Sequence, residues 1–101
     1  MTVLIPGYRY VCNNFDNRAN GQTVQFIEKT SDGANGFVTV HDGTTNEEVL
    51  KMMIDRLNYL QAKNPCRQNA IAITKLEEAL MWLNNRTEER KARGVEGTPS
   101  K

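Results

Sequence analysis

Three polar side chains in the C-terminal half of the sequence have the chemistry to hold a planar, phosphorylated ligand. Tyr59 offers an aromatic face for stacking, Asn69 offers both a donor and an acceptor, and Arg86 offers a planar guanidinium fork. Each also has a simpler explanation, as a packing aromatic, a local polar contact near a helix start, or a cation complementing a helix dipole. Taken singly, each residue favours the simpler explanation.

The spacing of these residues decides whether they can share one site. Tyr59 and Asn69 both lie near an expected bend between two helices, so they can meet within one chain. Asn69 and Arg86 are separated by roughly 25 Å of helix, more than a dinucleotide-sized ligand spans. An antiparallel pairing of two chains would bring Arg86 of one beside Tyr59 and Asn69 of the other. Such a dimer would have two equivalent sites.

The first helix is predicted by a capping box and an apolar repeat. Thr45 and Glu48 have the spacing at which each side chain satisfies an amide of the other residue. Apolar residues then recur every three or four positions, which predicts a helix over about 46–62.

The second helix is predicted to follow almost at once. Asn64 is the expected N-cap, Pro65 the expected first helical residue, and the helix should run to about Lys91 and stop near Gly94. The link is so short that we expect an antiparallel hairpin. The longer second helix should overhang the first by several turns that carry Met81, Trp82 and Leu83. We expect the sheet and a second copy of the chain to cover the overhang, with Trp82 packed in a core or an interface.

Residues 1–43 have the pattern of a small sheet. Short β-branched and aromatic runs at 8–11, 22–29 and 37–41 are separated by Asn, Asp and Gly clusters, which predicts a three-stranded antiparallel meander. The expected class is α+β, in one compact domain. The expected organisation is a β-meander at 1–43, a helical hairpin at 44–98 and a tail at 99–101.

The composition excludes several function classes. In 101 residues, 13 basic side chains stand against 12 acidic ones, whereas a DNA- or RNA-binding protein usually has a clearly basic surface. We expect no membrane span and no signal peptide, because the start lacks a charged region followed by a long apolar run. Cys12 and Cys66 are expected as free thiols in a reducing cytosol. The one histidine, His41, is better explained by a structural role, and no metal, cofactor or nucleophile motif accompanies it.

Two runs in the helical half are specific enough to carry a family resemblance: DGTTNEEVLKMMIDRLNYL and PCRQNAIAITKLEEALMWLNNRTEERKARGVEGT. Over about residues 42–98 they resemble the phage Thoeris anti-defence proteins that act as signal sponges. The helical hairpin is shared with a phage anti-CBASS sponge family. The β-rich part looks like the Thoeris type rather than the shorter anti-CBASS type.

The resemblance implies a protein that binds without catalysis. Such proteins hold, unaltered, a cyclic ADP-ribose isomer made by a bacterial TIR-domain sensor, in the cytoplasm of the infected host. Members are homodimers that can assemble into hexamers as trimers of dimers, and some bind cyclic oligonucleotides at a separate site. The resemblance places ligand binding at Tyr59, Asn69 and Arg86, with Arg90 a weaker candidate. Family members can carry Phe where this chain has Tyr59, whose hydroxyl could select among ligands.

Three other functions stay open from the sequence. The chain could sequester the cyclic di- or trinucleotides of CBASS immunity, instead of the first ligand or in addition to it. It could be an interaction module that binds a host protein through the overhanging helix. An enzyme that degrades the signal has least support, because no general base or metal cluster is visible.

Overall fold

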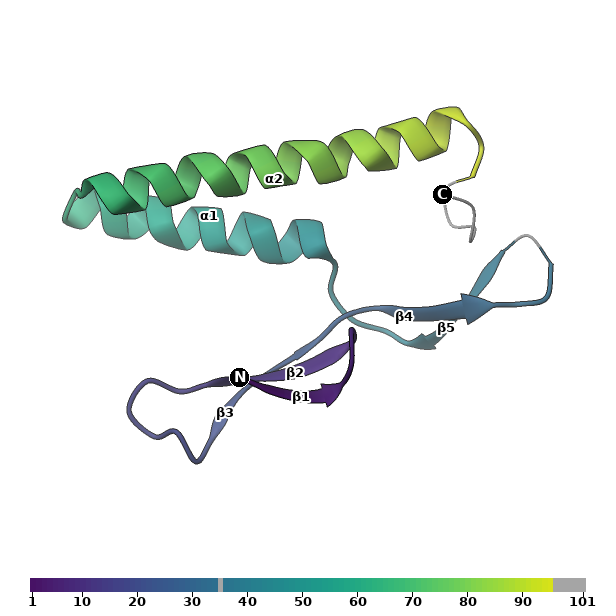
Figure 1. Cartoon of the computed structure of the whole chain (residues 1–101), viewed down its shortest axis with the longest axis horizontal. Coiled ribbons are helices and arrows are strands. Elements are labelled where there is room, and N and C mark those ends of the chain that lie inside the picture. The colour runs from purple at the N-terminus through teal and green to yellow at the C-terminus, as the bar shows by residue number, and fades with distance from the viewer. Residues whose placement is uncertain (35, 96–101) are drawn as a thin grey trace. The chain divides into compact units, whose positions relative to one another are not determined.

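The structure, a computed structural model, describes residues 1–34 and 36–95 and contains both strands and helices (Figure 1). This confirms the predicted α+β class. The chain divides into two compact units, Met1–Thr45 and Asn46–Lys101. The five strands of the described residues lie in the first unit and the two helices in the second.

Three strands form an antiparallel sheet in chain order: β1 (Thr2–Ile5), β2 (Arg9–Asn13) and β3 (Gly21–Gln25). The Tyr8 N–H closes the turn between β1 and β2 by donating to the Ile5 carbonyl at 2.9 Å. Gly7 in this turn has a φ of 83°, a left-handed conformation that glycine adopts without a steric penalty. The run predicted at 8–11 is therefore the middle strand of this sheet.

Two further strands pair antiparallel in a separate sheet: β4 (Glu28–Ser31) and β5 (Phe37–His41). The strand predicted at 22–29 is thus divided between β3 and β4, and the strand predicted at 37–41 pairs with β4. The predicted assignment of strands to a single meander was wrong. A three-stranded sheet is present, but β1 is one of its two outer strands, whereas the strand predicted at 37–41 belongs to the other sheet.

The division occurs at Phe26 and Ile27, where the chain changes its hydrogen-bond partner. The Ile27 N–H donates to the Thr44 carbonyl at 2.9 Å, and the Thr44 N–H donates to the Gln25 carbonyl at 2.8 Å. Gly43 permits this close crossing, because a Cβ there would lie 2.5 Å from the Gln25 carbonyl oxygen. Alternation of apolar and polar residues predicts a strand but does not show which other strand it pairs with. The sequence therefore predicted one continuous strand.

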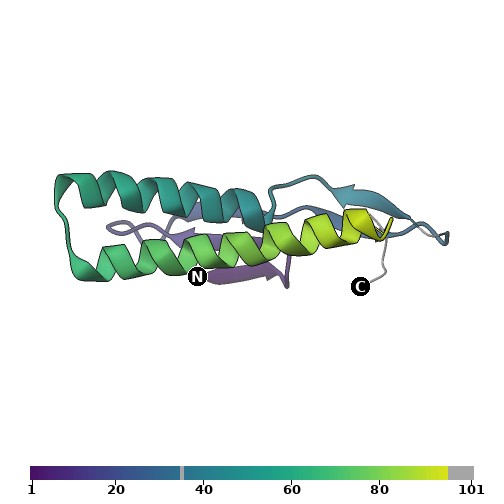
Figure 2. The ribbon, with the colours of Figure 1, turned by 90° about the horizontal axis from the view of Figure 1, so that it is seen from above.

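The second unit is an antiparallel pair of helices, α1 (Asn46–Lys63) and α2 (Arg67–Ala92) (Figure 2). The predicted hairpin and its first helix are confirmed to within one residue. Apolar side chains from both helices meet along one seam, where they are half-buried, and Ile73 is the one buried apolar side chain of the described residues. The half-buried members are Val49, Leu50, Met53, Ile54, Leu57, Leu60, Ala72, Leu76, Leu80 and Leu83.

The start of α2 differs from the prediction. Cys66, rather than Asn64, is the N-cap, with extended φ and ψ of −146° and 156° and a thiol that accepts from the Asn69 N–H at 3.4 Å. Pro65 therefore precedes the cap and is not the first helical residue. The Asn64 N–H still donates to the Leu60 carbonyl at 2.9 Å, so this residue completes α1 and cannot begin α2.

The end of α2 follows the prediction. Gly94 has a φ of 71°, and its N–H donates to the Lys91 carbonyl at 3.0 Å. The Val95 N–H donates to the Arg90 carbonyl at 2.9 Å, and the two bonds together form a Schellman motif. Of the RGVEGT segment, residues 93–95 thus form a helix cap. The predicted tail at 99–101 lies outside the described residues.

The two helices differ in length, with 18 residues in α1 and 26 in α2. At 1.5 Å per residue, α2 extends past the start of α1 by about 12 Å, or roughly two turns. Counted from the bend, Asn46 lies level with about residue 84, so the overhang begins later than predicted and does not include Met81, Trp82 or Leu83. Within the described residues, no helix is long and apolar enough to cross a membrane.

Candidate functional site

Tyr59 lies in the last turns of α1, close to the bend formed by residues 64–66. Its ring is exposed, at 61% of its accessible surface. The ammonium of Lys63, one turn later, lies over the ring at 4.6 Å from its centroid. The helix thus presents a flat aromatic surface to solvent with a cation already beside it, which is an arrangement suited to stacking a base that carries phosphates.

Asn69 lies on the other side of the bend, in the first turn of α2. Its backbone N–H is held by the Cys66 thiol, and its side chain is half-buried. Among the described residues, nothing forms a hydrogen bond with its side-chain amide. Tyr59 and Asn69 are therefore both near the bend, as the sequence predicted, and the donor and acceptor of Asn69 remain available to a ligand.

Arg86 is not brought to this end of the hairpin. It lies on the overhang of α2, and because α2 is uninterrupted from Arg67 to Ala92, about 25 Å of helix separate it from Asn69. The structure therefore agrees with the spacing argument that one chain cannot place Asn69 and Arg86 on one compact ligand.

Arg86 differs from the neighbouring cations in being unpaired. Lys91 pairs with Glu88 at 3.6 Å, and Arg93 pairs with Glu89 at 3.4 Å. Among residues 1–34 and 36–95, Arg86 has no ion-pair or hydrogen-bond partner, and its side chain is exposed. The local acidic residues thus leave one guanidinium free to bind an anion.

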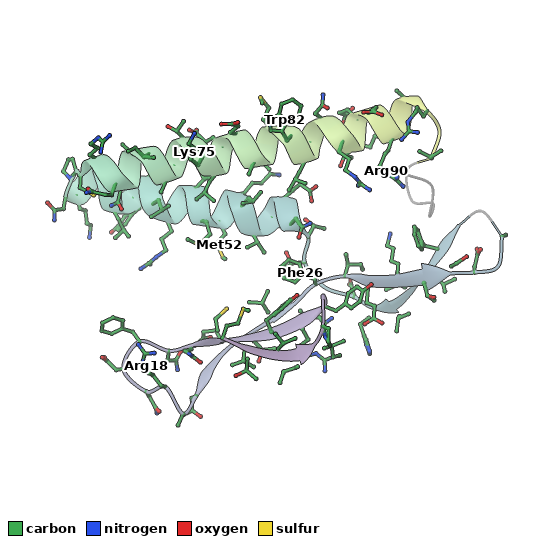
Figure 3. The ribbon with its side chains drawn as sticks, in the orientation of Figure 1. Arg18, Phe26, Met52, Lys75, Trp82 and Arg90 are labelled. Carbon is green, nitrogen blue, oxygen red and sulfur yellow. The ribbon has the colours of Figure 1, made fainter. Side chains whose placement is uncertain are left out.

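Arg90 is placed very differently. It is 6% exposed, and its Nη2 donates to the Val95 carbonyl at 3.0 Å (Figure 3). The same two residues are joined by the backbone bond that ends α2. Arg90 therefore has a structural role in closing the helix end, which the sequence did not indicate.

Gln61 is a residue at the bend that the sequence argument missed. Its side-chain amide accepts from the Cys66 N–H at 3.0 Å and donates to the Cys66 carbonyl at 2.9 Å. The sequence does contain a signal for Gln61. It is a polar residue directly after Leu60, the last apolar residue of the repeat in the first helix, and it lies on the side of that helix that faces the second.

Large apolar side chains are exposed on both helices of the hairpin, among them Met52, Ile71, Met81 and Trp82. Met52 projects from α1 and Trp82 from α2, and they are 59% and 60% exposed (Figure 3). Trp82 is therefore not part of the core of one chain.

The one histidine and the two cysteines of the chain are all exposed. His41 is exposed at the end of β5, and Cys12 and Cys66 are free, exposed thiols. The described part of the chain contains no group of three His, Cys, Asp or Glu side chains placed to hold a metal ion. The residues predicted from the sequence to form the site, Tyr59, Asn69 and Arg86, offer an aromatic face, an amide and a guanidinium.

Comparison with known proteins identifies the family. Residues 22–88, about two thirds of the chain, match the family model described as the Acb2/Tad1 hairpin domain. The chain is also 59% identical over 69 residues to Thoeris anti-defense 1 of Bacillus phage SBSphiJ7. That alignment covers 65% of this chain and 49% of the relative, so the chain matches about half of that protein's length. With this match extending from the sheet through most of the hairpin, the chain belongs to the Acb2/Tad1 hairpin family, the Thoeris anti-defence family that its sequence resembles.

Proposed function

We propose that this protein is a phage anti-defence sponge that binds a cyclic ADP-ribose signal, holds it unaltered, and so prevents activation of the Thoeris effector. Family membership carries the proposal, because the matched segment at 22–88 includes Tyr59, Asn69 and Arg86. The name of the Bacillus phage relative supports the anti-defence role. The exposed ring, the unbonded amide and the unpaired guanidinium support binding of a nucleotide.

Each of the three side chains takes a different part of the ligand. Tyr59 stacks on the adenine, a contact worth about 1–3 kcal/mol per base in nucleic-acid complexes. Asn69 reads a base edge or a ribose hydroxyl through its donor and acceptor. Arg86 binds the pyrophosphate through its planar fork. Arg90 is the weaker candidate for that charge, because one of its nitrogens already donates to Val95.

The site is completed by a second copy of the chain. A homodimer of antiparallel hairpins brings Arg86 of one chain to Tyr59 and Asn69 of the other, which gives two equivalent sites. The exposed side chains of Met81 and Trp82, 54% and 60% accessible in one chain, supply apolar surface for that contact. Three such dimers can associate further into a hexamer.

Sequestration sets a kinetic requirement on the site. A sponge acts by lowering the concentration of free ligand, so it must bind tightly and release slowly, and affinity within a family of related sites is set mainly by the rate of dissociation. A preorganised aromatic platform and an already unpaired cation meet this requirement, because little must be rearranged when the ligand arrives.

Three alternatives are distinguished by what the protein binds and what it releases. A sponge for the cyclic di- or trinucleotides of CBASS immunity would use the same recognition chemistry. A module that binds a host protein would use the exposed surface around Trp82 and would bind no nucleotide. An enzyme that degrades the signal would return an altered ligand.

One experiment separates these functions. Purified protein is incubated with cyclic ADP-ribose isomers, a cyclic dinucleotide and a cyclic trinucleotide, washed, and then denatured by heat. We expect intact cyclic ADP-ribose to be released and identified by mass spectrometry. A chemically altered ligand would overturn the sponge, and retention of cyclic oligonucleotides alone would favour CBASS.

The matched variants for this experiment lie on one helix. Arg86→Ala should abolish retention, whereas Lys91→Ala, which removes an ion-paired cation from the same helix, should retain the ligand like the wild type. Equal retention by both variants would contradict the assignment of Arg86.

A further inference from the structure

The bend between α1 and α2 is held by a single side chain. Within the described residues, Gln61 is the one side chain that forms hydrogen bonds across the bend, and it satisfies both backbone groups of Cys66, at 3.0 Å and 2.9 Å. The Gln61 side-chain amide pairs with Cys66 as a neighbouring strand would. It accepts from the Cys66 N–H and donates to the Cys66 carbonyl. These two hydrogen bonds fix both the position and the orientation of Cys66.

Cys66 passes this restraint to the first turn of α2. Its thiol accepts from the Asn69 N–H at 3.4 Å, and its carbonyl accepts from the Ala70 N–H at 3.2 Å. The carbonyl that Gln61 binds is therefore also the first acceptor of the helix. Gln61 and the first turn of α2, which contains Asn69, are therefore joined through the same residue, Cys66.

Gln61 can act in this way without touching a ligand. Successive helical residues are rotated by about 100°, so Gln61 and Tyr59 point about 200° apart around α1. Consistent with this, Gln61 is half-buried towards α2, whereas Tyr59 is exposed. The hydrogen bonds of Gln61 and the stacking face of Tyr59 thus lie on different sides of one helix.

We propose that Gln61 is a positioning residue for the ligand site, and this inference rests on the proposed function. By holding Cys66, it sets the placement of the Asn69 amide relative to the Tyr59 ring before a ligand is present. Without the Gln61 hydrogen bonds, the bend adopts several geometries. Ligand binding must then select one of them, which costs binding free energy. Affinity for a ligand that contacts both residues then falls, even though neither contact residue has been changed.

The test replaces the amide while keeping the shape of the side chain. Gln61→Met fills a similar volume without a hydrogen bond, and Gln61→Glu retains an acceptor for the Cys66 N–H but places a second oxygen against the Cys66 carbonyl. Asn58→Ala is the matched control, because Asn58 donates its amide to the Ile54 carbonyl at 3.0 Å within α1 and does not bridge the bend. Dissociation constants for the retained cyclic ADP-ribose isomer are measured well below the Tm of each variant, together with oligomeric state and helix content.

We expect Gln61→Met to weaken binding about tenfold, which corresponds to about 1.4 kcal/mol and matches the net value of one or two hydrogen bonds. Gln61→Glu should also weaken binding, because its second oxygen is repelled by the Cys66 carbonyl, and Asn58→Ala should bind like the wild type. A residue that only stabilises the fold would lower the Tm and leave the affinity of the folded protein unchanged, so this readout separates positioning from stability.

The outcomes are distinct. If folded Gln61→Met binds as tightly as the wild type, the positioning role is overturned and the sponge function stands. If Gln61→Met does not fold, Gln61→Glu decides in the same way, and wild-type affinity in that variant overturns the inference. If the wild type retains none of the cyclic nucleotides, the proposed function falls and the positioning role falls with it.

Discussion

The ammonium of Lys63 lies 4.6 Å from the centroid of the Tyr59 ring, on a surface that is otherwise open to solvent. Tyr59 is still 61% exposed, so part of its surface remains open beside this cation. A ligand that stacks on the exposed ring meets an aromatic surface whose surroundings carry positive charge.

Tyr59 variants should separate stacking from hydroxyl selectivity. Tyr59→Ala should weaken binding of cyclic ADP-ribose by about 1–3 kcal/mol, because the stacking surface is lost. Tyr59→Phe keeps the ring, so it should stay close to wild-type affinity for the best ligand while changing the ranking of isomers if the hydroxyl selects among them. Calorimetric titration with each isomer measures both effects. Wild-type affinity in Tyr59→Ala would exclude stacking.

Removing the Lys63 charge should have an effect that depends on salt. Lys63→Met should weaken binding of an anionic nucleotide several-fold at low ionic strength, and the difference should shrink as salt screens the charge. Lys51→Met is the matched control, because Lys51 lies near the start of α1 and pairs with Glu48 at 3.6 Å. Association rates measured over a series of salt concentrations test this. A deficit that is independent of salt would point to loss of packing instead.

Mixed dimers should reveal whether the site is shared. One protein carries both Tyr59→Ala and Asn69→Ala, and a second protein carries Arg86→Ala. Each should bind no ligand when it forms dimers only with itself. After unfolding and refolding together, about half of the dimers should contain both chains, and each of these has one intact site of two. The mixture should therefore bind about a quarter of the wild-type amount of ligand. Binding that stays at zero would show that the three residues do not combine across chains.

Cys66 should be replaceable by serine but not by alanine. Cys66→Ala removes the acceptor for the Asn69 N–H and should lower the free energy of unfolding by about 0.5–2 kcal/mol, whereas serine is a preferred N-cap and should keep or raise it. Urea denaturation at one fixed protein concentration measures the difference, since association changes apparent stability. A serine variant as unstable as the alanine variant would show that the thiol contributes through packing.

Arg90 and Arg86 should differ in what their loss affects. Arg90 is buried and donates to the Val95 carbonyl, so Arg90→Ala should lower the free energy of unfolding by about 1–3 kcal/mol. Arg86→Ala should leave stability nearly unchanged and remove ligand binding. Denaturation and calorimetry on both variants give the comparison. An Arg90→Ala variant with full stability and no binding would instead assign the main phosphate contact to Arg90.

The helical half could be predicted closely because its signals are local. A capping box and an apolar repeat set the bounds of α1, and Gly94 marked the end of α2. The start of α2 was assigned to Asn64 because Asn followed by Pro is a common helix start. The structure instead uses the thiol of Cys66, a weak acceptor that sequence patterns do not single out as a helix cap.

The sheet and the site were harder to predict for a different reason. The change from β3 to β4 depends on Thr44 crossing at Gln25, a pairing between residues far apart in the sequence. Arg90 is buried where it bonds to Val95 in the helix cap that follows. In the sequence, Arg86 and Arg90 look alike, because both are arginines near the end of the same predicted helix. Residue type identified the candidates, but only the structure distinguishes the exposed guanidinium from the buried one.

The unbroken course of α2 has a consequence for how such a protein can evolve. Asn69 and Arg86 lie on one uninterrupted helix. Inserting or deleting a single residue between them would therefore rotate one about 100° relative to the other and move it by about 1.5 Å along the axis. Substitutions on the exposed surface of that stretch leave the distance and the angle unchanged. Under the proposed function, selection would hold the length of this segment fixed, while exposed positions outside the proposed dimer contact could change.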